Sequence, residues 1–454
     1  MNPESKSIVR SLVAFAEATE WAALSEPVRR EVTRAWLNWT ACAIGGSRTE
    51  AMAVALAGMQ ALYPGGTVLL LGRSERVVPS AAALLGALSS TAQTFDDTHF
   101  ATTAHPTGPV AAALLAVAHV LAGEGQPVAG SQLLAALAVG MEIECRVSCA
   151  ITANGGHPGW FITGLSGGIG AAAAVGRLLR LTRRQQSDAM GLAAMQASGC
   201  RASHGSMAMT CIPGFAAQSG LMSAYMARAG FTASEGSIDG HNGLLQVLTG
   251  QADIQTIEAE LGERFEFLNN AYKPFPCGFV IHASLDACMH ILGKAKISSD
   301  RIERIELRVH PKALSLCWRK LPTNVFAAQV SLFHWVAAAF VRGAAGVAEG
   351  ELECIMDPRV RALQERSHAT ADPELTENQA GIAVHLCDGE VIEHFTENAI
   401  GSQTHPMTDL QLQEKFQGLV GPVLGKRRTQ DLLDACWSLP GISDSAHLLV
   451  LGAI

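Results

Sequence analysis

Residues 94–108 gather side chains that can move a proton: two adjacent carboxylates, Asp96 and Asp97, and two histidines, His99 and His105. A histidine titrates near neutral pH, so it can take a proton from carbon and return it, and a carboxylate such as Asp97 can orient the ring. Ala-rich apolar segments flank this run. Because the segment after it is strongly helical, we expect His105 near a helix N-terminus, which favours an anion. The alternative is an ordinary capping loop with surface histidines.

A second loop repeats this arrangement. Residues 154–160 hold the pair His157-Pro158, and an Ala- and Gly-rich segment over 163–181 follows, which we predict to be a closely packed helix. Proline keeps the residue before it out of the helical conformation. His105 and His157 should therefore both project from loops at helix starts.

Other groups that could bind an anion or carry a proton also lie in loops or at predicted helix starts: Arg201, His204, Lys273 and His282. Lys and Arg side chains can hold substrate carboxylates and stabilise developing negative charge. Taken alone, any one of the histidines is better explained by a structural role. Their collection in loops between apolar helices favours a common site.

Sequence motifs for metals and cofactors are absent. The chain has no His-Glu-x-x-His, calcium loop, P-loop or Gly-x-Ser-x-Gly, and no Gly-x-Gly-x-x-Gly after a strand. The glycines of 167–170 lie inside a helical pattern, where packing explains them. We therefore expect acid–base chemistry with no metal and no cofactor.

Composition narrows the class of protein. Of the 454 residues, 48% are hydrophobic and 16% are charged, so large cores can be buried. The net charge of −8 and the lack of a Lys/Arg run argue against nucleic acid as a partner, while a small anionic substrate remains compatible. Eleven cysteines without Cys-x-x-Cys pairs predict reduced thiols in the cytoplasm. We expect neither a signal peptide nor a membrane-spanning segment.

The hydrophobic pattern predicts a mainly α protein, and the pattern changes once along the chain. Through about residue 265 the pattern indicates helices joined by short connections. One of them, over 131–150, carries Glu142, Glu144 and Arg146, which we expect on a solvent-facing polar side.

A Pro-rich junction at 272–278 marks the change to an α+β region over about 267–400. Residues 303–310 alternate as in a half-buried strand, and Asp388-Gly389 should form the turn of a hairpin. The capping box Thr408-x-x-Gln411 begins a last helical region.

Several motifs of this chain resemble those of one known family. The run Phe95-Asp96-Asp97-Thr98-His99, followed by His105-Pro106, resembles the MmgE/PrpD family, which includes 2-methylcitrate dehydratase, cis-aconitate decarboxylase and iminodisuccinate epimerase. Further matches follow in register and cover nearly the whole chain. They are Gln196-Ala197-Ser198-Gly199-x-Arg201, Gly205-Ser206-Met207, Lys273-x-Phe275-Pro276-Cys277 with His282, and segment 401–416.

The resemblance implies a large all-helical domain built from both chain ends, residues 1–266 and 401–454, and a smaller α+β lid domain over 267–400. The active site would lie in the cleft between them. The resemblance also implies a homodimer that needs no metal or organic cofactor. Its substrates would be small di- or tricarboxylates, and the reaction would begin with removal of a proton next to a carboxylate.

Matching the motifs position by position also implies roles for individual residues. The catalytic residues would be His105, His157 and Asp97. The substrate-binding residues would be Thr98, Lys273, Arg201, His282 and His99.

This chain also departs from the pattern of the family. Where the family often has Lys and His after Gly-Ser-Met, this chain has Met209 and Ile212. One extra residue lies between Thr98 and His105. Further differences are Thr94 for an Asp, Gly278 for a His and His334 for a Tyr.

These replacements remove groups that dehydration or decarboxylation would use. Dehydration needs an acid for the leaving hydroxyl as well as a base, whereas epimerisation needs only a base on one face and an acid on the other. We therefore expect an epimerase of a dicarboxylate such as iminodisuccinate, with His105 and His157 transferring protons and Lys273 holding a carboxylate. A 2-methylcitrate-type dehydratase and a catalytically inactive binding protein are the alternatives.

Overall fold

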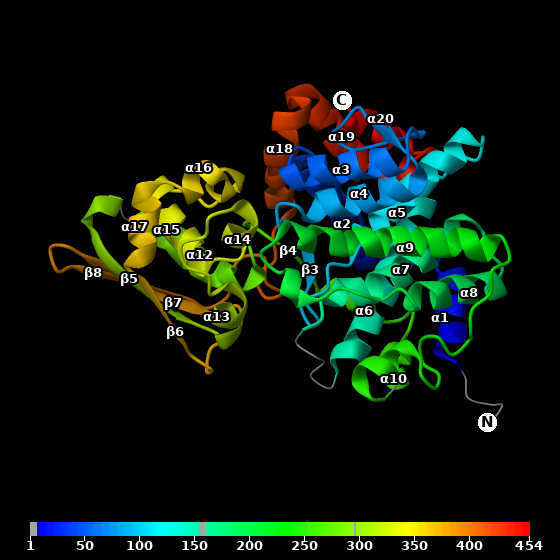
Figure 1. Ribbon diagram of the computed structural model, residues 1–454, viewed down its shortest axis with the longest axis horizontal. Helices are drawn as coiled ribbons and strands as arrows, with labels where there is room; N and C mark the ends of the chain where they lie inside the picture. The colour runs from blue at the N-terminus through cyan, green and yellow to red at the C-terminus, as the bar shows by residue number, and fades with distance from the viewer. Residues whose placement is uncertain (1–6, 154–158, 252, 295–296) are drawn as a thin grey trace.

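The computed structural model describes residues 7–153, 159–251, 253–294 and 297–454. Within these ranges the chain is mainly α, as predicted, with helices α1–α20 and eight short strands, of which β1 (Val68–Leu69) and β2 (Arg76–Val77) form a pair in the large lobe. Figure 1 shows a large helical lobe on the right and a smaller lobe on the left, which holds a four-stranded sheet.

Two segments that are far apart in sequence build the large lobe. The first supplies α1 (Ile8–Ala18), α2 (Glu26–Gly46), α3 (Glu50–Leu62), α4 (Pro79–Thr91), α5 (Thr107–Gly123), α6 (Gly130–Thr152), α7 (Ile162–Leu178), α8 (Arg183–Ala194), α9 (Cys211–Arg228), α10 (Leu244–Thr249) and α11 (Ile254–Glu258). The second supplies α18 (Asp409–Leu424), α19 (Lys426–Trp437) and α20 (His447–Gly452). Helix α18, which opens with the predicted Thr408 and Gln411 capping box, packs along α2 (Figure 1).

The small lobe follows the Pro-rich junction. Its helices are α12 (His282–Lys294), α13 (Pro311–Cys317), α14 (Val325–Gln329), α15 (Leu332–Arg342), α16 (Leu352–Ile355) and α17 (Pro358–Glu365). Its strands are β5 (Ile302–Val309), β6 (Ser367–Ala371), β7 (Ala380–Leu386) and β8 (Val391–Thr396), in the order β6-β5-β7-β8.

The sheet of the small lobe confirms the strand and hairpin predictions. In β5, Ile305, Leu307 and Val309 are buried, while Glu306 and Arg308 between them are exposed. β5 pairs parallel to β6 and antiparallel to β7, and β7 and β8 form the antiparallel hairpin. Gly389, in the hairpin turn, has a φ of 91°, which an L side chain rarely adopts.

Each lobe has its own hydrophobic core. The core of the large lobe includes Leu412 and Phe416 of α18 together with residues of α1 to α9. The core of the small lobe is drawn from residues between Cys277 and Ala399. We propose that these cores mark two domains, with 1–266 and 401–454 in one and 267–400 in the other.

Glycine allows the central helices of the large lobe to approach closely. A Cβ atom on Gly170 of α7 would lie 2.5 Å from the main-chain oxygen of Gly140 on α6. A Cβ atom on Gly220 of α9 would lie 2.5 Å from the side chain of Ala171. The small residues over 163–181 therefore do let α7 contact both neighbours at short range, as the sequence predicted.

The prediction of a solvent-facing polar side on α6 was wrong, because Glu142, Glu144 and Arg146 are all fully buried. Arg146 Nε lies 2.6 Å from Glu142 Oε1, and its terminal nitrogens donate to main-chain oxygens such as that of Ile257, at 2.7 Å. A carboxylate and the carbonyls of residues far away in sequence thus satisfy the guanidinium. Periodicity within one helix cannot reveal such partners.

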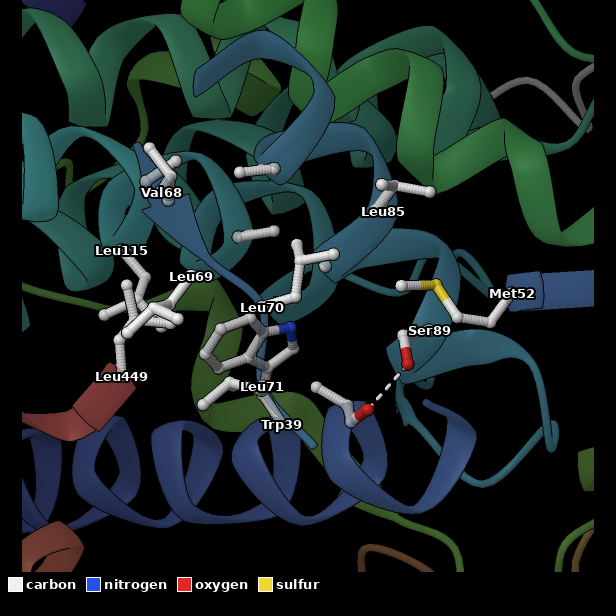
Figure 2. Close-up of a pocket in the computed structure, with 15 residues that line it drawn as sticks. Trp39, Met52, Val68, Leu69, Leu70, Leu71, Leu85, Ser89, Leu115 and Leu449 are labelled. Atoms are coloured by element: carbon white, nitrogen blue, oxygen red, sulfur yellow. Dashed lines mark hydrogen bonds between the residues drawn. The ribbon is translucent and has the colours of Figure 1, made fainter. Parts of the chain in front are cut away.

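A small cavity in the large lobe is unsuited to a carboxylate substrate. It has a volume of about 20 Å³ and is lined by apolar side chains such as Trp39, Leu85 and Leu449 (Figure 2). No charged side chain lines it, and the hydroxyl of Ser89 donates to the carbonyl of Ala43 at 2.6 Å.

Among the described helices, none has both the length and the apolar character needed to cross a bilayer.

The α6–α7 contact predicts opposite effects for two Gly→Ala substitutions. Gly170→Ala should lower the free energy of unfolding by about 1–3 kcal/mol, because the new methyl group would force the two backbones apart. Gly58→Ala, at an exposed position of α3 with open space around it, should raise it by about 0.5–1 kcal/mol. Urea unfolding followed by circular dichroism measures both, and equal effects would contradict the packing assigned to Gly170.

Candidate active site

Two short strands bring the polar run of 94–108 to the Pro-rich junction. Strand β3 (Asp97–His99) pairs antiparallel with β4 (Asn270–Tyr272), with Asp97 opposite Tyr272 and His99 opposite Asn270. Both strands lie where the two lobes meet (Figure 1). Lys273 directly follows β4, so this pairing places Lys273 beside the residues that precede β3.

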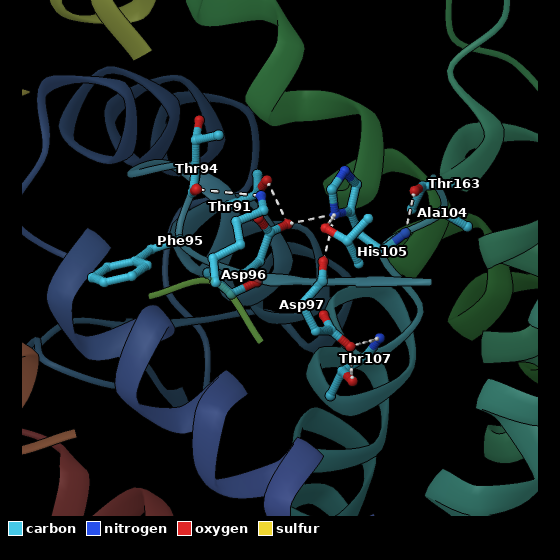
Figure 3. A network of polar contacts seen from close by, with 12 residues as sticks. Thr91, Thr94, Phe95, Asp96, Asp97, Ala104, His105, Thr107 and Thr163 are labelled. Carbon is cyan, nitrogen blue, oxygen red and sulfur yellow. Dashed lines mark hydrogen bonds and ion pairs between the residues drawn. The ribbon is translucent and has the colours of Figure 1, made fainter. Parts of the chain in front are cut away.

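The centre of this region is an ion pair between Lys273 and Asp96. Lys273 Nζ donates to Asp96 Oδ1 at 2.8 Å and to the carbonyl of Thr94 at 3.2 Å. The other carboxylate oxygen of Asp96 accepts from Thr91 Oγ1 at 3.0 Å and lies 3.4 Å from His105 Nδ1 (Figure 3). Lys273 and Asp96 are only 2% and 5% exposed, so this is a buried ion pair.

His105 is held in one orientation by main-chain groups. The ring nitrogen Nδ1 donates to the main-chain carbonyl of Asp97 at 2.6 Å (Figure 3). The backbone N–H of His105 donates to Thr163 Oγ1 at 2.8 Å. A carbonyl only accepts, so Nδ1 carries a hydrogen and Nε2 remains as the basic nitrogen when the ring is neutral. The hydroxyl of Thr98 lies 3.4 Å from the same Nδ1.

The side chains of Asp96 and Asp97 contact different groups, and it is Asp96 whose carboxylate faces His105. Asp96 faces His105, whereas the Asp97 side chain accepts from the N–H and hydroxyl of Thr107 and from Asn270 Nδ2 at 2.6 Å. Asp97 therefore orients His105 through its main-chain oxygen. Its carboxylate occupies the N-terminus of α5, where the sequence suggested that a substrate anion could bind.

The two carboxyl groups also differ in electrostatics. Burial acts to raise the pKa of Asp96, but the charges of His105 and Lys273 and the hydrogen bonds from Lys273 and Thr91 outweigh it, so this pKa lies below its ordinary value. Burial raises the pKa of Asp97 by more than its hydrogen bonds lower it. Asp96 is thus the stable anion of the pair.

Lys415 is a residue of this region to which the sequence analysis gave no role. It reaches in from α18 and donates to Asn38 Oδ1 at 2.8 Å, to the carbonyl of Phe95 at 2.7 Å and to that of Lys273 at 3.0 Å. Its ammonium also lies 4.0 Å from the centre of the Phe95 ring. The only signal in the sequence was its place in the matching segment 401–416.

One wall next to His105 is apolar. Phe161, Met209 and Ile212 form a separate hydrophobic cluster, and the ring centres of Phe161 and His105 are 5.6 Å apart. Met209 and Ile212 are the positions where the family resemblance implies Lys and His. Two of the departures from the family pattern therefore pack against Phe161, whose ring lies next to the candidate base.

The remaining predicted site residues lie at different distances from this centre. Arg201 is partly buried and donates to the carbonyl of Trp160 at 2.9 Å and to Thr103 Oγ1 at 3.0 Å. His99 makes its contacts with Thr102 and Glu266 instead of with the ion pair. His157 lies outside the described residues.

His282 is buried between two aromatic rings. The rings of Phe275 and Phe279 meet it edge to face, with centres 5.7 and 5.4 Å away. Burial and the nearby charge of Lys273 lower the pKa of His282 to about 3, so the ring is neutral at physiological pH. A buried neutral ring of this kind fits a packing or hydrogen-bonding role better than proton transfer.

The backbone of the loop before β3 is strained and is tied to the small lobe. Thr94 has a φ of 52°, unusual for a β-branched residue. Its hydroxyl donates to Gln329 Oε1 at 2.7 Å, and Gln329 Nε2 donates to the carbonyl of Ala92 at 2.9 Å. A cavity of about 450 Å³ between the lobes is lined by Gln329 and by Pro276 of the junction.

The burial of Lys415 predicts a specific pH dependence of stability. Burial lowers its pKa to about 8 from the ordinary 10.5, with the charge of Lys273 adding to this and Cys42, Asp96 and Asp97 opposing it. Between these pH values the unfolded chain binds more protons than the folded chain, so this residue makes the free energy of unfolding rise with pH. Relative to Lys415→Met, the wild type should therefore gain on the order of 2 kcal/mol from pH 8 to 10.

Urea unfolding at a series of pH values measures this difference. Thiols that are buried in the folded chain become exposed on unfolding and lose their protons in the same pH range in both proteins, so only the difference between wild type and variant is informative. Lys426→Met, at an exposed position of α19, is the control and should show no such trend. A difference for Lys415→Met that stays constant with pH would contradict the assignment.

Two domain models and several curated proteins match this chain. The model of the MmgE/PrpD N-terminal domain matches residues 10–257, and that of the C-terminal domain matches residues 275–439. A cis-aconitate decarboxylase of Aspergillus terreus is 25% identical over 91% of this chain and 89% of its own length. A human cis-aconitate decarboxylase is 24% identical over 98% of this chain and 94% of its own length. Because the two domain models together match most of its length, the chain belongs to the MmgE/PrpD family.

Proposed function

We propose that this protein is a cofactor-independent epimerase that removes and returns a proton at a carbon next to a carboxylate of a small dicarboxylate, such as iminodisuccinate. The coarser part rests on the family, whose relatives in the comparison are cis-aconitate decarboxylases, enzymes named for a small carboxylic acid. The observation that carries the finer part is the environment of His105: a fixed basic nitrogen, a buried ammonium nearby and an apolar wall.

The proton-transfer step follows from the tautomer of His105. Its Nδ1 donates to the Asp97 carbonyl, so Nε2 is the nitrogen that would take the substrate proton. The imidazolium formed would then face the Asp96 carboxylate, 3.4 Å from Nδ1, which stabilises that charge. His157 is our proposed acid on the opposite face of the carbon.

Lys273 supplies the positive charge for the substrate. An ammonium has three N–H donors, and Asp96 and the Thr94 carbonyl use two of them. We propose that the third binds the substrate carboxylate and stabilises the enolate-like intermediate. Thr98, beside His105, and the partly buried Arg201 would complete the binding of the substrate.

The apolar wall favours epimerisation over loss of a leaving group. A dehydratase must protonate a departing hydroxyl, which needs a second acid close to the reacting carbon. Met209 and Ile212 hold no proton donor, and they cluster with Phe161 against His105. An epimerase needs no such donor.

A lyase is the second candidate, because the similar proteins are named cis-aconitate decarboxylases. In that case dehydration of a 2-methylcitrate-like acid would start from the same base, whereas in a decarboxylation the loss of carbon dioxide leaves the electron pair on carbon and protonated His105 would supply the proton. The product separates the proposals: a dehydratase releases water and forms an alkene, a decarboxylase releases carbon dioxide, and an epimerase does neither.

These proposals predict hydrogen exchange at the substrate. With a panel of small di- and tricarboxylates in deuterated water, including an iminodicarboxylate, cis-aconitate and 2-methylcitrate, we expect the α-hydrogen of the dicarboxylate to exchange for deuterium. His105→Gln should slow this exchange by about 10²–10⁴-fold, because glutamine can donate to the Asp97 carbonyl but has no basic nitrogen. Proton NMR measures the exchange.

The matched control is His405→Gln, which changes an exposed histidine and should leave the rate unchanged. Alkene absorbance or carbon dioxide release would identify a lyase instead. If no member of the panel exchanges, forms an alkene or releases carbon dioxide, both enzyme proposals fail and an inactive binding protein remains. Undiminished exchange by folded His105→Gln would overturn the role given to this residue.

We also propose that the protein is a cytoplasmic homodimer. All eleven cysteines are unpaired, which fits a reducing compartment. Helix α9 exposes Phe215, Met222 and Met226, spaced so that they share one face, and a second copy of the chain would cover them.

Light scattering should give twice the chain mass of 47.7 kDa. Met222→Glu should shift the population toward the single chain, because a charge would be placed in the covered face. Val54→Glu, at an exposed apolar position of α3, is the control and should leave the mass unchanged. A single-chain mass for the wild type would contradict the proposal.

A further inference from the structure

Three potential metal ligands lie together at the end of β3. They are His99 of β3, Cys149 in the last turn of α6 and Glu266 of the short segment before β4. One ligand atom from each lies within 4.8 Å of the other two, and His99 Nε2 is 3.9 Å from Glu266 Oε2. The three come from distant parts of the sequence, which is why no sequence motif indicated them.

His99 is fully buried with one ring nitrogen unused. Among the described residues no hydrogen-bond partner reaches Nε2, while Nδ1 lies 2.9 Å from Thr102 Oγ1. A buried polar atom without a partner is unusual in a folded protein. If Nδ1 carries the hydrogen and donates it to Thr102, Nε2 presents a lone pair, as in a metal-bound histidine whose other nitrogen is held by an outer partner.

The two other groups are positioned to share the ion. Arg264 binds Glu266 Oε1, so Oε2 is the oxygen turned toward His99, where Asn269 Nδ2 also donates to it at 3.2 Å. Cys149 is partly buried and free. Burial, then the charges of Glu266 and Glu142, raises its pKa to about 12, so without an ion it is a neutral thiol.

Two arginines also lie nearby, and neither excludes a cation. Arg146 is fully engaged with Glu142 and with main-chain carbonyls such as that of Ala259. Arg264 is bound to Glu260 and Glu266, and its side chain is 44% exposed, so solvent screens its charge.

We propose that His99, Cys149 and Glu266 form a binding site for Zn²⁺, with a water molecule as the fourth ligand. A nitrogen, a sulfur and an oxygen suit zinc, whereas Ca²⁺ and Mg²⁺ select oxygen ligands alone. In a tetrahedral zinc site with bonds of about 2.0–2.3 Å, the ligand atoms lie roughly 3.5 Å apart. Rotations of the three side chains that move their ligand atoms by about 1 Å would bring them to this spacing. The ion displaces the thiol proton, which leaves to water, and the thiolate and Glu266 balance its two charges.

This site would fix the strand pair that builds the active-site region. His99 lies opposite Asn270 in the β3–β4 register, and Asn270 Nδ2 holds the Asp97 carboxylate at 2.6 Å. An ion bridging β3, α6 and the segment before β4 would therefore stabilise the position of Asp97 and Thr98. The role is structural, so it does not depend on which reaction the protein catalyses.

Cobalt(II) is the probe, because it replaces zinc and its thiolate complexes absorb light. After treatment with a chelator, the full-length protein should bind one Co²⁺ per chain, with a thiolate-to-cobalt band in the near ultraviolet and the visible bands of a tetrahedral site. Cys149→Ser should abolish the ultraviolet band. Cys200→Ser, which changes an exposed cysteine elsewhere, should keep it.

A second variant keeps the test decisive if Cys149→Ser does not fold. Thr102→Val retains all three ligands but removes the partner of His99 Nδ1, and it should weaken cobalt binding by about 10–100-fold. Zn²⁺ should also raise the thermal unfolding midpoint of the wild type. Absence of the thiolate band in the wild type, or its persistence in Cys149→Ser, would overturn the proposal.

Discussion

The buried ion pair between Lys273 and Asp96 is the interaction on which the candidate site depends. Removing two charges from water is costly, and only close pairing with additional hydrogen bonds compensates for it. Here the Thr91 hydroxyl donates a hydrogen bond to the carboxylate, and the Thr94 carbonyl accepts one from the ammonium. Because the partners are 177 residues apart in sequence, the pair also joins the loop before β3 to the junction between the lobes.

Lys415 adds a second buried ammonium behind this pair. Its three acceptors come from α2, from the loop before β3 and from the junction, so one side chain of the C-terminal segment holds together the main-chain atoms on either side of the ion pair. The two buried ammonium groups thus lie on either side of the loop that carries Asp96, and each is satisfied by acceptors from distant parts of the chain.

Local patterns in the sequence were enough for much of the fold. The alternation in β5, the Asp-Gly turn between β7 and β8 and the capping box of α18 each depend on residues close together in the chain, and each was predicted. The burial of Arg146 was not, because its partners are carbonyls more than 100 residues away. The same limit hid the role of Lys415.

The assignments around His105 show this limit at the level of single atoms. The sequence could place Asp96, Asp97 and His105 in one loop, but which carboxylate faces the ring depends on the pairing of β3 with β4. In that register Asn270 and Thr107 bind the side chain of Asp97, which leaves Asp96 for His105 and Lys273. The sequence suggested that a carboxylate such as Asp97 could orient the ring, whereas in the structure the carboxylate that faces His105 is that of Asp96 and Asp97 contacts the ring through its carbonyl.

The apolar cluster of Phe161, Met209 and Ile212 bears on how one scaffold supports different reactions. In the proposed mechanism, the ion pair and the orientation of His105 provide the first step, which is removal of a proton next to a carboxylate. The fate of the carbanion then depends on whether another proton donor reaches it or its leaving group. At two positions where the family resemblance implies Lys and His, this chain has side chains without a transferable proton. The intermediate would then have fewer outcomes available, and return of a proton to the same carbon is the one that needs the fewest groups.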